Sequence, residues 1–354
     1  MACITACGYD CPDCCSLLVE TDGQEVRVKG NPEHPFTKGL ICAKGRGIPQ
    51  RLRSPERITQ PLKRSGQDLV PISWDEALSS CAEHLDRLAA TPTQVLHARG
   101  HGYRGVLGAA SKFFFRAFGA SCLYGSLCDD TGIEACLKDF GTLDTNDPQD
   151  WLNTSLMVNW GRDLSRTSIH LLSLVKTLRK QGVLATCISP GGDDWQRYAD
   201  EHIRIRPGTD RFLALAVLAM LFQDKDPGAR VMEASRDPER FLAMIRAQDI
   251  SRLLSICNVA RSKAEHLAEL YASKEPVLSL ISWGLQRYTH GGENVRFINA
   301  LSFLAGHVGR PGGGAVFNHS SARNFHPWHR EAGEYGRKLL LQDLPNELAK
   351  ADPP

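Results

Sequence analysis

The sequence lacks a charge excess, a long apolar run and any low-complexity tract. Its 354 residues carry 42 Lys and Arg against 40 Asp and Glu, a formal net charge of +2. Because the two signs are mixed along the chain, no basic stripe is available to neutralise nucleic-acid phosphates, and we expect no nucleic-acid partner. The longest apolar run, residues 212–222, is well short of the roughly 20 residues that a spanning helix needs. We therefore expect no membrane span.

A targeting segment is also missing from the start of the sequence. Residues 1–7 (MACITAC) show no basic region, no apolar region and no twin-arginine signal, which predicts a cytoplasmic location. The chain is 42% hydrophobic, with 31 Gly and 19 Pro, a composition that excludes disorder and collagen-like repeats. At roughly 100–200 residues per domain, its length allows two or three domains, each with its own core.

Cysteine is the abundant residue: the chain has twelve, and five of them lie within the first fifteen residues. In a cytosolic chain, clustered cysteines bind metal more readily than they form disulfides, because thiols there stay reduced. Closely spaced thiolates joined by one from a distant turn are typical of an iron-sulfur cluster. Tetrahedral zinc is the alternative, although zinc sites usually have two close pairs of ligands. Spacing alone leaves the register open among the N-terminal candidates, which are Cys3, Cys7, Cys11, Cys14 and Cys15, with Cys42 as the remote thiol.

Strand and helix patterns alternate through the rest of the chain, which predicts an α/β fold. Residues 155–160 and 183–188 resemble buried strands on either side of a helix over 168–180, a parallel βαβ unit. Further strands are predicted at 202–205 and 277–282. Residues 16–21 and 25–29 are predicted to form a hairpin across Asp22-Gly23. Ser73 is predicted to cap one helix and Thr209, with Asp210, to cap another. We expect no nicotinamide-binding fold, because we identify no strand that is followed by the Gly-x-Gly-x-x-Gly turn of such a fold.

Several stretches of this sequence together resemble the opening of the molybdopterin oxidoreductases, the formate dehydrogenase and dimethyl sulfoxide reductase superfamily. The resemblance covers nearly the whole chain. It is carried by Cys7 to Ser16 (CGYDCPDCCS), Gly30 to Pro35 (GNPEHP), Gly39 to Gly45 (GLICAKG), Arg51 to Arg64 (RLRSPERITQPLKR), Ile72 to Leu78 (ISWDEAL) and Gly306 to Gly314 (GHVGRPGGG).

The resemblance implies a ligand set for the cysteines. Cys7, Cys11, Cys15 and Cys42 would bind a 4Fe-4S cluster, and Cys3 and Cys14 would not take part. Lys44 would lie between that cluster and the pterin, as the matching lysine does in the family. A cation in that position would stabilise negative charge on either partner during electron transfer.

The resemblance also implies binding loops for two pterin guanine dinucleotides at the ends of the predicted strands, where such ligands bind in doubly wound sheets. Ser189 stands where the family usually carries a ribose-binding Asp, so Asp193 or Asp194 would substitute. Asp163 and Leu164 replace the Asn-Pro of another family turn. The implied cofactor-binding residues are Gly161, Arg162, Ser189, Pro190, Asp194, Pro207, Gly208, Asp210, Trp283 and Gly284.

Cys128 is the implied ligand of molybdenum or tungsten. It lies in Gly125 to Gly132 (GSLCDDTG), which matches the family loop that carries this ligand. A soft thiolate there would supplement the dithiolene sulfurs and tune the redox step of the metal. Formate dehydrogenases typically have His after this ligand, whereas this chain has Asp129. Formate and sulfur or other oxyanions are therefore equally open as substrates.

These expectations combine into one architecture. A small N-terminal iron-sulfur domain (1–60) precedes two doubly wound Rossmann-like α/β domains, one inserted in the other. The outer domain is discontinuous and incomplete (61–125 plus 282–354), the inserted domain is 126–281, and the C-terminal domain of family enzymes is absent.

The predicted function is two-electron redox of a small anion at a molybdenum or tungsten bis(molybdopterin guanine dinucleotide), with electrons passing through the 4Fe-4S cluster. A redox partner or a complementary C-terminal subunit is expected. The alternatives are a non-catalytic iron-sulfur electron-transfer subunit or fragment of such an enzyme, a zinc-stabilised binding protein, and a non-redox hydratase of the same superfamily.

Overall fold

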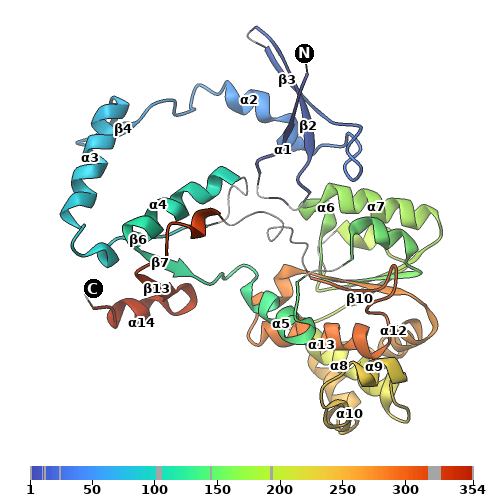
Figure 1. Cartoon of the computed structure of the whole chain (residues 1–354). Helices are drawn as coiled ribbons and strands as arrows, with labels where there is room; N and C mark the ends of the chain where they lie inside the picture. Colours follow the sequence, from blue (N-terminus) through green and yellow to red (C-terminus); the bar gives the residue numbers. More distant parts are fainter. Residues whose placement is uncertain are drawn as a thin grey trace. The chain divides into compact units, whose positions relative to one another are not determined.

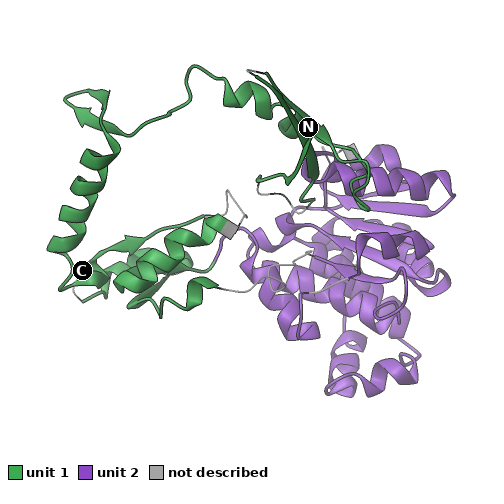
Figure 2. Cartoon of the chain, turned by 45° about the horizontal axis from the view of Figure 1, so that its top comes forward, with its two compact units in different colours: residues 1–125, 323–354 green, residues 126–322 purple. Residues whose placement is uncertain are grey.

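A computed structural model describes residues 2–9, 11, 13–23, 25–100, 106–143, 146–191, 194–317 and 328–352. The chain forms two compact units: residues 1–125 with 323–354, and residues 126–322 (Figure 2). Unit 2 therefore lies in the sequence between the two parts of unit 1. In the described part of the chain, no helix is long and apolar enough to cross a membrane.

Unit 2 is built on a five-stranded parallel sheet (Figure 1). Every residue of the central strands β8 and β11 is buried, which explains why both are continuous hydrophobic runs rather than alternating patterns. The register pairs Val158 of β8 with Ser279 of β11 on one side and with Thr186 of β9 on the other. The strands in spatial order are β10 Glu201–Arg204, β9 Leu184–Ser189, β8 Leu156–Trp160, β11 Val277–Ile281 and β12 Gly314–Val316.

Helices connect these strands and cover the sheet. Ser168 starts α7 by accepting a hydrogen bond from the Leu171 amide (3.2 Å). The Thr209 hydroxyl, which we expected to cap α8, instead donates to the Arg206 carbonyl (2.6 Å). The helices are α5 Asp130–Phe140, α6 Leu164–Thr167, α7 Ile169–Lys180, α8 Asp210–Phe222, α9 Ala229–Glu233, α10 Pro238–Arg246, α11 Ile250–Cys257, α12 Arg261–Ser273 and α13 Gly291–Leu304, with the short 3-10 helices η3 Pro148–Asn153, η4 Asp194–Tyr198 and η5 Trp283–Arg287.

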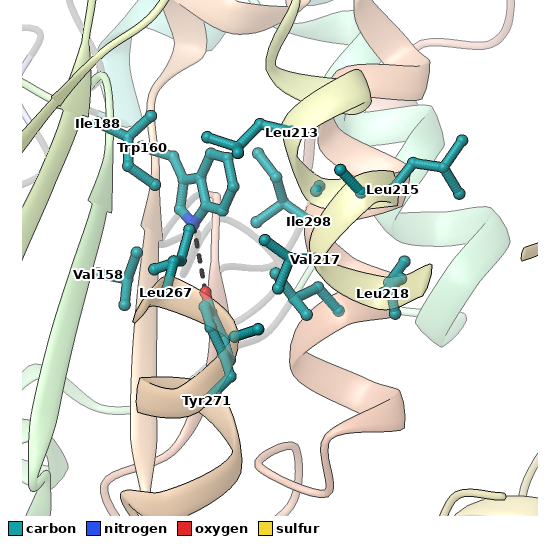
Figure 3. Close-up of a cluster of buried hydrophobic side chains, with 14 of the residues drawn as sticks. Val158, Trp160, Ile188, Leu213, Leu215, Val217, Leu218, Leu267, Tyr271 and Ile298 are labelled. Carbon is teal, nitrogen blue, oxygen red and sulfur yellow. Dashed lines mark hydrogen bonds between the residues drawn. The ribbon is translucent and has the colours of Figure 1, made fainter. Parts of the chain in front are cut away.

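The core of unit 2 lies between the sheet and α8, α12 and α13 (Figure 3). Its largest side chains include Trp160, whose indole N–H donates to the hydroxyl of Tyr271 (3.3 Å). That hydroxyl also hydrogen-bonds with Ser279 (2.7 Å), which in turn hydrogen-bonds with Ser302 (2.7 Å). These four buried polar side chains thus pair with one another, as burial in an apolar interior favours.

Residues 282–322 belong to unit 2, which corrects the predicted outer domain of 61–125 plus 282–354. The reason is strand pairing: β11 pairs with β8 and also with β12, so the chain stays in the same sheet after residue 281. The predicted boundary between 125 and 126 coincides with the boundary of the units.

Unit 1 contains three separate small sheets. The first is the antiparallel β1-β2-β3, the second is the hairpin β4-β5, and the third is the parallel β13-β7-β6, on which α4 packs. The elements are β1 Cys3–Ala6, β2 Ser16–Asp22, β3 Glu25–Gly30, α1 Ala43–Arg46, α2 Ile48–Leu52, β4 Leu62–Ser65, β5 Asp68–Pro71, α3 Trp74–Arg87, β6 Leu96–His97, α4 Ala110–Phe118, β7 Ser121–Tyr124, β13 Arg337–Leu340 and α14 Leu344–Ala349, with the 3-10 helices η1 Pro92–Gln94, η2 Val106–Ala109, η7 Trp328–Arg330 and η8 Leu341–Asp343.

Candidate functional site

Four of the N-terminal cysteines, Cys7, Cys11, Cys14 and Cys15, lie on the loop between β1 and β2. The Cys7 amide donates to the Cys15 carbonyl (2.8 Å), which closes this loop at its base. Cys15 is buried beside Leu17 and Ile41, and Cys7 packs against the same group. The loop is therefore held by β2 on one side and by the residue before Cys42 on the other.

Cys42 reaches this loop because the chain folds back after β3. The Asn31 amide donates to the Ser16 carbonyl (2.9 Å), and its side chain donates to the Ser16 hydroxyl (3.1 Å). A Cβ at Gly30 would lie 2.2 Å from the Gly39 carbonyl oxygen, so this return of the chain requires glycine. The segment of residues 31–42 is thus brought against β2, the strand that directly follows Cys15.

The four thiols of the implied ligand set act on one another. Burial raises the pKa of Cys7 and raises that of Cys11 to about 11, and repulsion from Cys15 and Cys42 adds to both. In the described residues, no three His, Cys, Asp or Glu side chains are arranged to hold one metal ion. The ligands of a 4Fe-4S cluster bind different irons, so they need to surround a cluster rather than meet at one point. Iron would also stabilise the thiolates that burial disfavours.

The remaining N-terminal candidates have other surroundings. Cys3 is exposed on β1, and the Cys14 thiol contacts the Cys11 carbonyl (3.6 Å). Lys44 is exposed on α1, two residues after Cys42. Its position between a cluster and a pterin stays a prediction.

The loops after β8 and β11 meet at the carboxyl edge of the unit 2 sheet. The Ser282 amide donates to the Trp160 carbonyl (3.0 Å), and a Cβ added to Gly161 would lie 2.8 Å from the Leu285 side chain. Gly161 has φ +67°, a conformation that favours glycine. Because strand order reverses between β8 and β11, this is the position where doubly wound sheets bind ligands.

Buried and capping polar groups fix both of these turns. Asn159 bonds to the Arg162 amide (3.1 Å) and carbonyl (2.9 Å), so the backbone after Gly161 is set from the sheet. Asp163, where the family turn has Asn, caps α6 by accepting from the Ser165 amide (3.1 Å). The Ser282 hydroxyl accepts from the Gly284 amide (3.1 Å), beside Trp283.

The loop after β9 lies at the same edge. Ser189 is buried, and its hydroxyl bonds to His202 Nε2 (3.1 Å) and accepts from the Gly191 amide (3.3 Å). Pro190 is exposed. Of the proposed substitutes for the missing carboxylate, Asp193 lies outside the described residues, and Asp194 begins η4 with a side chain that the structure does not describe.

The loop after β10 completes this edge. Gly208 has φ +75°, and a Cβ there would lie 2.7 Å from the Tyr288 ring, so the turn after Pro207 requires glycine. Asp210 begins α8 and is only 4% exposed. Burial raises its pKa to about 6.

Cys128 is anchored to the segment that follows β11. Gln286, itself 4% exposed, donates to the Cys128 carbonyl (2.7 Å) and accepts from the Thr131 amide (3.1 Å). Arg287 donates from Nη2 to Cys128 Sγ (3.1 Å) and from Nε to the Cys128 carbonyl (3.3 Å). The thiol of Cys128 is half-exposed. It faces the Arg287 guanidinium at the sheet edge where the loops gather.

Asp129, the residue after Cys128, is buried and bonded within its own loop. It is 6% exposed, and its carboxylate accepts from the Ser126 hydroxyl (2.8 Å). That hydroxyl also accepts from the Cys128 amide (3.0 Å). The carboxylate next to Cys128 is thus hydrogen-bonded within the loop.

Sequence reasoning missed Arg287 and the role of Asn159. Arg287 directly follows the stretch Ser282 to Gln286, on which the resemblance places the second dinucleotide, so its place after a strand end was the available signal. No sequence pattern pairs Gln286 or Arg287 with Cys128, which is separated from Arg287 by 159 positions.

One glycine motif needs a correction. A Gly-x-Gly-x-x-Gly spacing does occur at residues 100–105 (GHGYRG), after β6. Residues 101–105 lie outside the described residues. The next strand, β7, is followed by Gly125-Ser126 rather than by the acidic residue that a nicotinamide fold carries there, so the motif is incomplete.

Comparison with known proteins places these features in one family. Residues 57–351 match the family model of molybdopterin oxidoreductases, and residues 3–54 match that of the molybdopterin oxidoreductase Fe4S4 domain. The chain is 35% identical over 318 residues to "Probable oxidoreductase YyaE" of Bacillus subtilis (strain 168), covering 88% of this chain and 48% of that protein. It is 23% identical over 326 residues to the assimilatory nitrate reductase catalytic subunit of the same organism, covering 86% and 44%.

A solved structure shows the same fold. Acetylene hydratase from Pelobacter acetylenicus superposes with a TM-score of 0.73 at 18% sequence identity, covering 85% of this chain and 44% of the hydratase. The chain spans about half the length of the curated relatives that it matches. The match of both family models over most of its length shows that the chain belongs to the molybdopterin oxidoreductases.

Proposed function

We propose that this chain carries the iron-sulfur cluster and the metal ligand of an oxidoreductase that acts on a small anion. The observation that carries the proposal is Cys128 with the Arg287 guanidinium 3.1 Å from its sulfur. Both lie at the sheet edge where the loops after β8, β9, β10 and β11 meet. Of the reactive side chains at this edge, Cys128 is the soft thiolate that a molybdenum or tungsten centre would take.

The predicted residues fit the cofactor in position and chemistry. Gly161 and Gly208 add no side chain to their loops. The turn at Gly284 is fixed by the hydrogen bond from its amide to the Ser282 hydroxyl. We propose that these loops, with Arg162, Ser189, Pro190, Asp194, Pro207, Asp210 and Trp283, hold the guanine dinucleotides of two molybdopterins. Bound there, the pterin dithiolene and its molybdenum or tungsten would supply the two-electron chemistry.

Arg287 supports an anionic substrate. A guanidinium binds oxyanions by paired hydrogen bonds, and it offsets the negative charge of a thiolate ligand beside it. Asp129 is buried and its carboxylate is bonded to Ser126, so it does not present an exposed negative charge to an anionic substrate. Among the relatives, one is named a nitrate reductase, one a dimethyl sulfoxide reductase chain and one a formate dehydrogenase subunit, and we propose formate or a sulfur or other oxyanion here.

The electron path would begin at the four cysteines. We propose that Cys7, Cys11, Cys15 and Cys42 hold a 4Fe-4S cluster and that Lys44 lies between it and the pterin. Burial raises the pKa of Cys7 and Cys11, repulsion from Cys15 and Cys42 adds to both, and bound iron would offset this effect, which supports the proposal. We further propose that the β13-β7-β6 sheet is part of a second α/β domain interrupted in sequence by unit 2, and that the cytoplasmic location holds.

The chain matches only about half the length of each of these relatives, which supports a partner that supplies the rest. The chain corresponds to 48% of YyaE and 44% of the nitrate reductase subunit. We propose that it works with a redox partner or with a chain that supplies the remaining part of the enzyme. The same observation supports the second candidate function, an iron-sulfur electron-transfer subunit or fragment without its own catalysis.

The test uses native protein purified anaerobically with whatever copurifies. Oxidation or reduction of formate, nitrate, thiosulfate and other oxyanions is followed with a viologen dye, for the wild type and for Cys128→Ala. We expect activity with one of these anions, lost in Cys128→Ala while the iron content stays unchanged. Cys136→Ala, a buried cysteine in the same unit, serves as the matched control. Equal activity of Cys128→Ala and wild type would overturn the proposed metal ligand.

A further inference from the structure

Two helices of unit 2 begin directly after loops that carry predicted site residues. Helix α5 follows the Cys128 loop (residues 126–129), and α8 follows the turn at Pro207-Gly208. The first amides of a helix have no partner within the helix, and the side chain of the N-cap residue usually accepts from one of them. Among the described residues, neither N-cap residue, Asp129 nor Thr209, makes such a bond with its side chain. Both helix starts therefore need acceptors from elsewhere.

Two buried side-chain amides from the segment after β11 supply these acceptors. Gln286 of η5 accepts from the Thr131 amide, at the second position of α5 (3.1 Å). Asn294 of α13 accepts from the Arg211 amide, at the second position of α8 (3.1 Å). Gln286 is 4% exposed and Asn294 is fully buried. Residues that follow β11 thus hold the starts of both helices.

The donor nitrogens of the same two amides bond to backbone carbonyls. Gln286 Nε2 donates to the carbonyls of Cys128 (2.7 Å) and Leu127 (3.3 Å). Asn294 Nδ2 donates to the carbonyl of Leu285 (2.9 Å), the residue before Gln286. An amide side chain can accept and donate at once, which neither a carboxylate nor an apolar side chain can do. A continuous path of bonds therefore runs from the start of α8 to the Cys128 loop.

The segment between the two amides is closely packed. A Cβ added to Gly291 would lie 2.1 Å from the Gln286 carbonyl oxygen, so α13 can begin this close to η5 only with glycine there. The Gly291 amide also donates to the Tyr288 carbonyl (2.8 Å), and the Leu285 amide donates to the Ser282 carbonyl (3.3 Å). The position of Gln286 is therefore set by α13, the helix that carries Asn294.

We propose that Asn294 is a positioning residue for Cys128 and that it acts through Leu285 and Gln286. It fixes the Cys128 loop relative to the loop that ends at the start of α8. This inference rests on the proposed function, in which Cys128 is the metal ligand and residues 207–210 contact a dinucleotide. A metal ligand and a cofactor-binding loop need a fixed spacing for the cofactor to be held in one geometry.

The test is the rate at which iodoacetamide alkylates Cys128 in the full chain. The protein is purified anaerobically from cells grown without molybdate or tungstate, and alkylation is followed by peptide mass spectrometry. Gln286→Ala removes the bonds to the Cys128 loop, and we expect it to speed alkylation of this half-exposed thiol about tenfold or more. Asn294→Ala removes one bond of the path and should speed it about threefold or more.

A double variant tests the path itself. If Asn294 acts through Gln286, the chain with both alanines should be alkylated as fast as Gln286→Ala alone. Asn294→Asp keeps the side-chain volume, which covers the case in which Asn294→Ala does not fold. Its carboxylate, ionised beside the Arg211 guanidinium, accepts but cannot donate to Leu285, so it should speed alkylation as Asn294→Ala does.

Asn299→Ala is the matched control. Asn299 lies on the same helix and is 1% exposed, and its Nδ2 donates to the Asp139 carboxylate (3.0 Å) at the other end of α5. Its removal should lower the stability of unit 2 and leave the alkylation rate of Cys128 at the wild-type value. The control therefore separates a loss of positioning from a general loosening of the fold.

Three outcomes would overturn this proposal. The first is a wild-type alkylation rate in Asn294→Ala or Asn294→Asp. The second is an equal increase in Asn299→Ala, which would show general loosening of unit 2. The third is a double variant whose rate increase equals the product of the two single increases, which would show that the two amides act independently. None of these readouts depends on bound molybdenum or tungsten, whereas a failure of the proposed metal ligand would appear as equal activity of Cys128→Ala and wild type.

Discussion

The iron-sulfur region and unit 2 achieve order by different means. In the described residues, the hydrophobic group of the iron-sulfur region has three buried members, Cys15, Leu17 and Ile41. Unit 2 buries two complete central strands and nearly all of α8. A region of about 60 residues buries little surface on folding and usually needs a bound metal or covalent cross-links to be stable. The difference indicates that metal substitutes for a core at one end of the chain and is not needed for folding at the other.

The largest effect that would test this difference is loss of a cluster ligand. In Cys42→Ser we expect iron to fall to a small fraction of the wild-type content and residues 3–52 to lose hydrogen-exchange protection, because metal binding and folding are coupled there. Strands β8 and β11 should keep their protection. Cys3→Ser, at an exposed cysteine of the same region, should retain iron. Retained protection of 3–52 in iron-free Cys42→Ser would contradict the comparison.

The converse change removes a core side chain of unit 2. Trp160 is fully buried, so Trp160→Ala should lower the free energy of unfolding of unit 2 by about 3–5 kcal/mol. Trp160→Phe, which keeps most of the volume, should lower it less. Iron content should be unchanged in both variants. Urea unfolding followed by circular dichroism gives the free energies, and a loss of iron in Trp160→Ala would show that the regions do not fold separately.

A smaller effect concerns Asp210, a buried carboxyl at the start of α8. Its folded-state pKa of about 6 exceeds the usual 3.8, so the folded state binds the proton more tightly than the unfolded state does. Stability of unit 2 should therefore fall as the pH rises from about 4 through 6 and level off above that. Asp210→Asn should remove this dependence and, by about 1.36 kcal/mol per pKa unit, add about 2–3 kcal/mol at pH 8.

The measurement for Asp210 is urea unfolding of wild type and Asp210→Asn at several pH values from 4 to 8. At pH 4 the two proteins should have nearly equal stability, since the carboxyl is then neutral. Iron content should not respond to the substitution. A wild type that becomes more stable as the pH rises through 6, relative to Asp210→Asn, would contradict the raised pKa.

The smallest effects distinguish two helix caps. Ser73 accepts from the Glu76 amide (3.1 Å) at the start of α3, and Ser168 caps α7 in unit 2. Ser168→Ala should lower the stability of unit 2 by about 1 kcal/mol, a usual value for a lost cap. No residue of α3 is buried, so Ser73→Ala should increase hydrogen exchange within α3 and leave the unfolding midpoint of unit 2 unchanged. Equal effects on that midpoint would show that α3 unfolds together with unit 2.

The sequence predicted local structure well where one signal dominated. The Asp22-Gly23 turn and its two strands, the Ser73 cap and the runs of β8 and β11 depend on neighbouring residues or on hydrophobic pattern, and each is confirmed. The return of residues 282–322 to the unit 2 sheet was not predicted, because β12 pairs with β11 at a separation of 36 residues and no local pattern marks that pairing.

The candidate site shows the same limit. Cys128 and the loop glycines could be proposed from their motifs, whereas the Arg287–Cys128 contact joins residues 159 positions apart through a packed turn. Thr209 was expected to cap α8 but bonds to Arg206, since a hydroxyl next to a tight turn has two competing partners. The partners of Cys128 and Thr209 depend on which groups the fold brings together, and local sequence does not contain that information.

The most direct test of the central claim is metal analysis with electron paramagnetic resonance on anaerobically prepared native protein. The account predicts about four iron per chain, the content of one 4Fe-4S cluster, a signal from the reduced cluster, and molybdenum or tungsten in the same preparation. Cys42→Ser should lose the iron signal. A colourless preparation that contains zinc, with neither iron nor molybdenum or tungsten, would contradict the account.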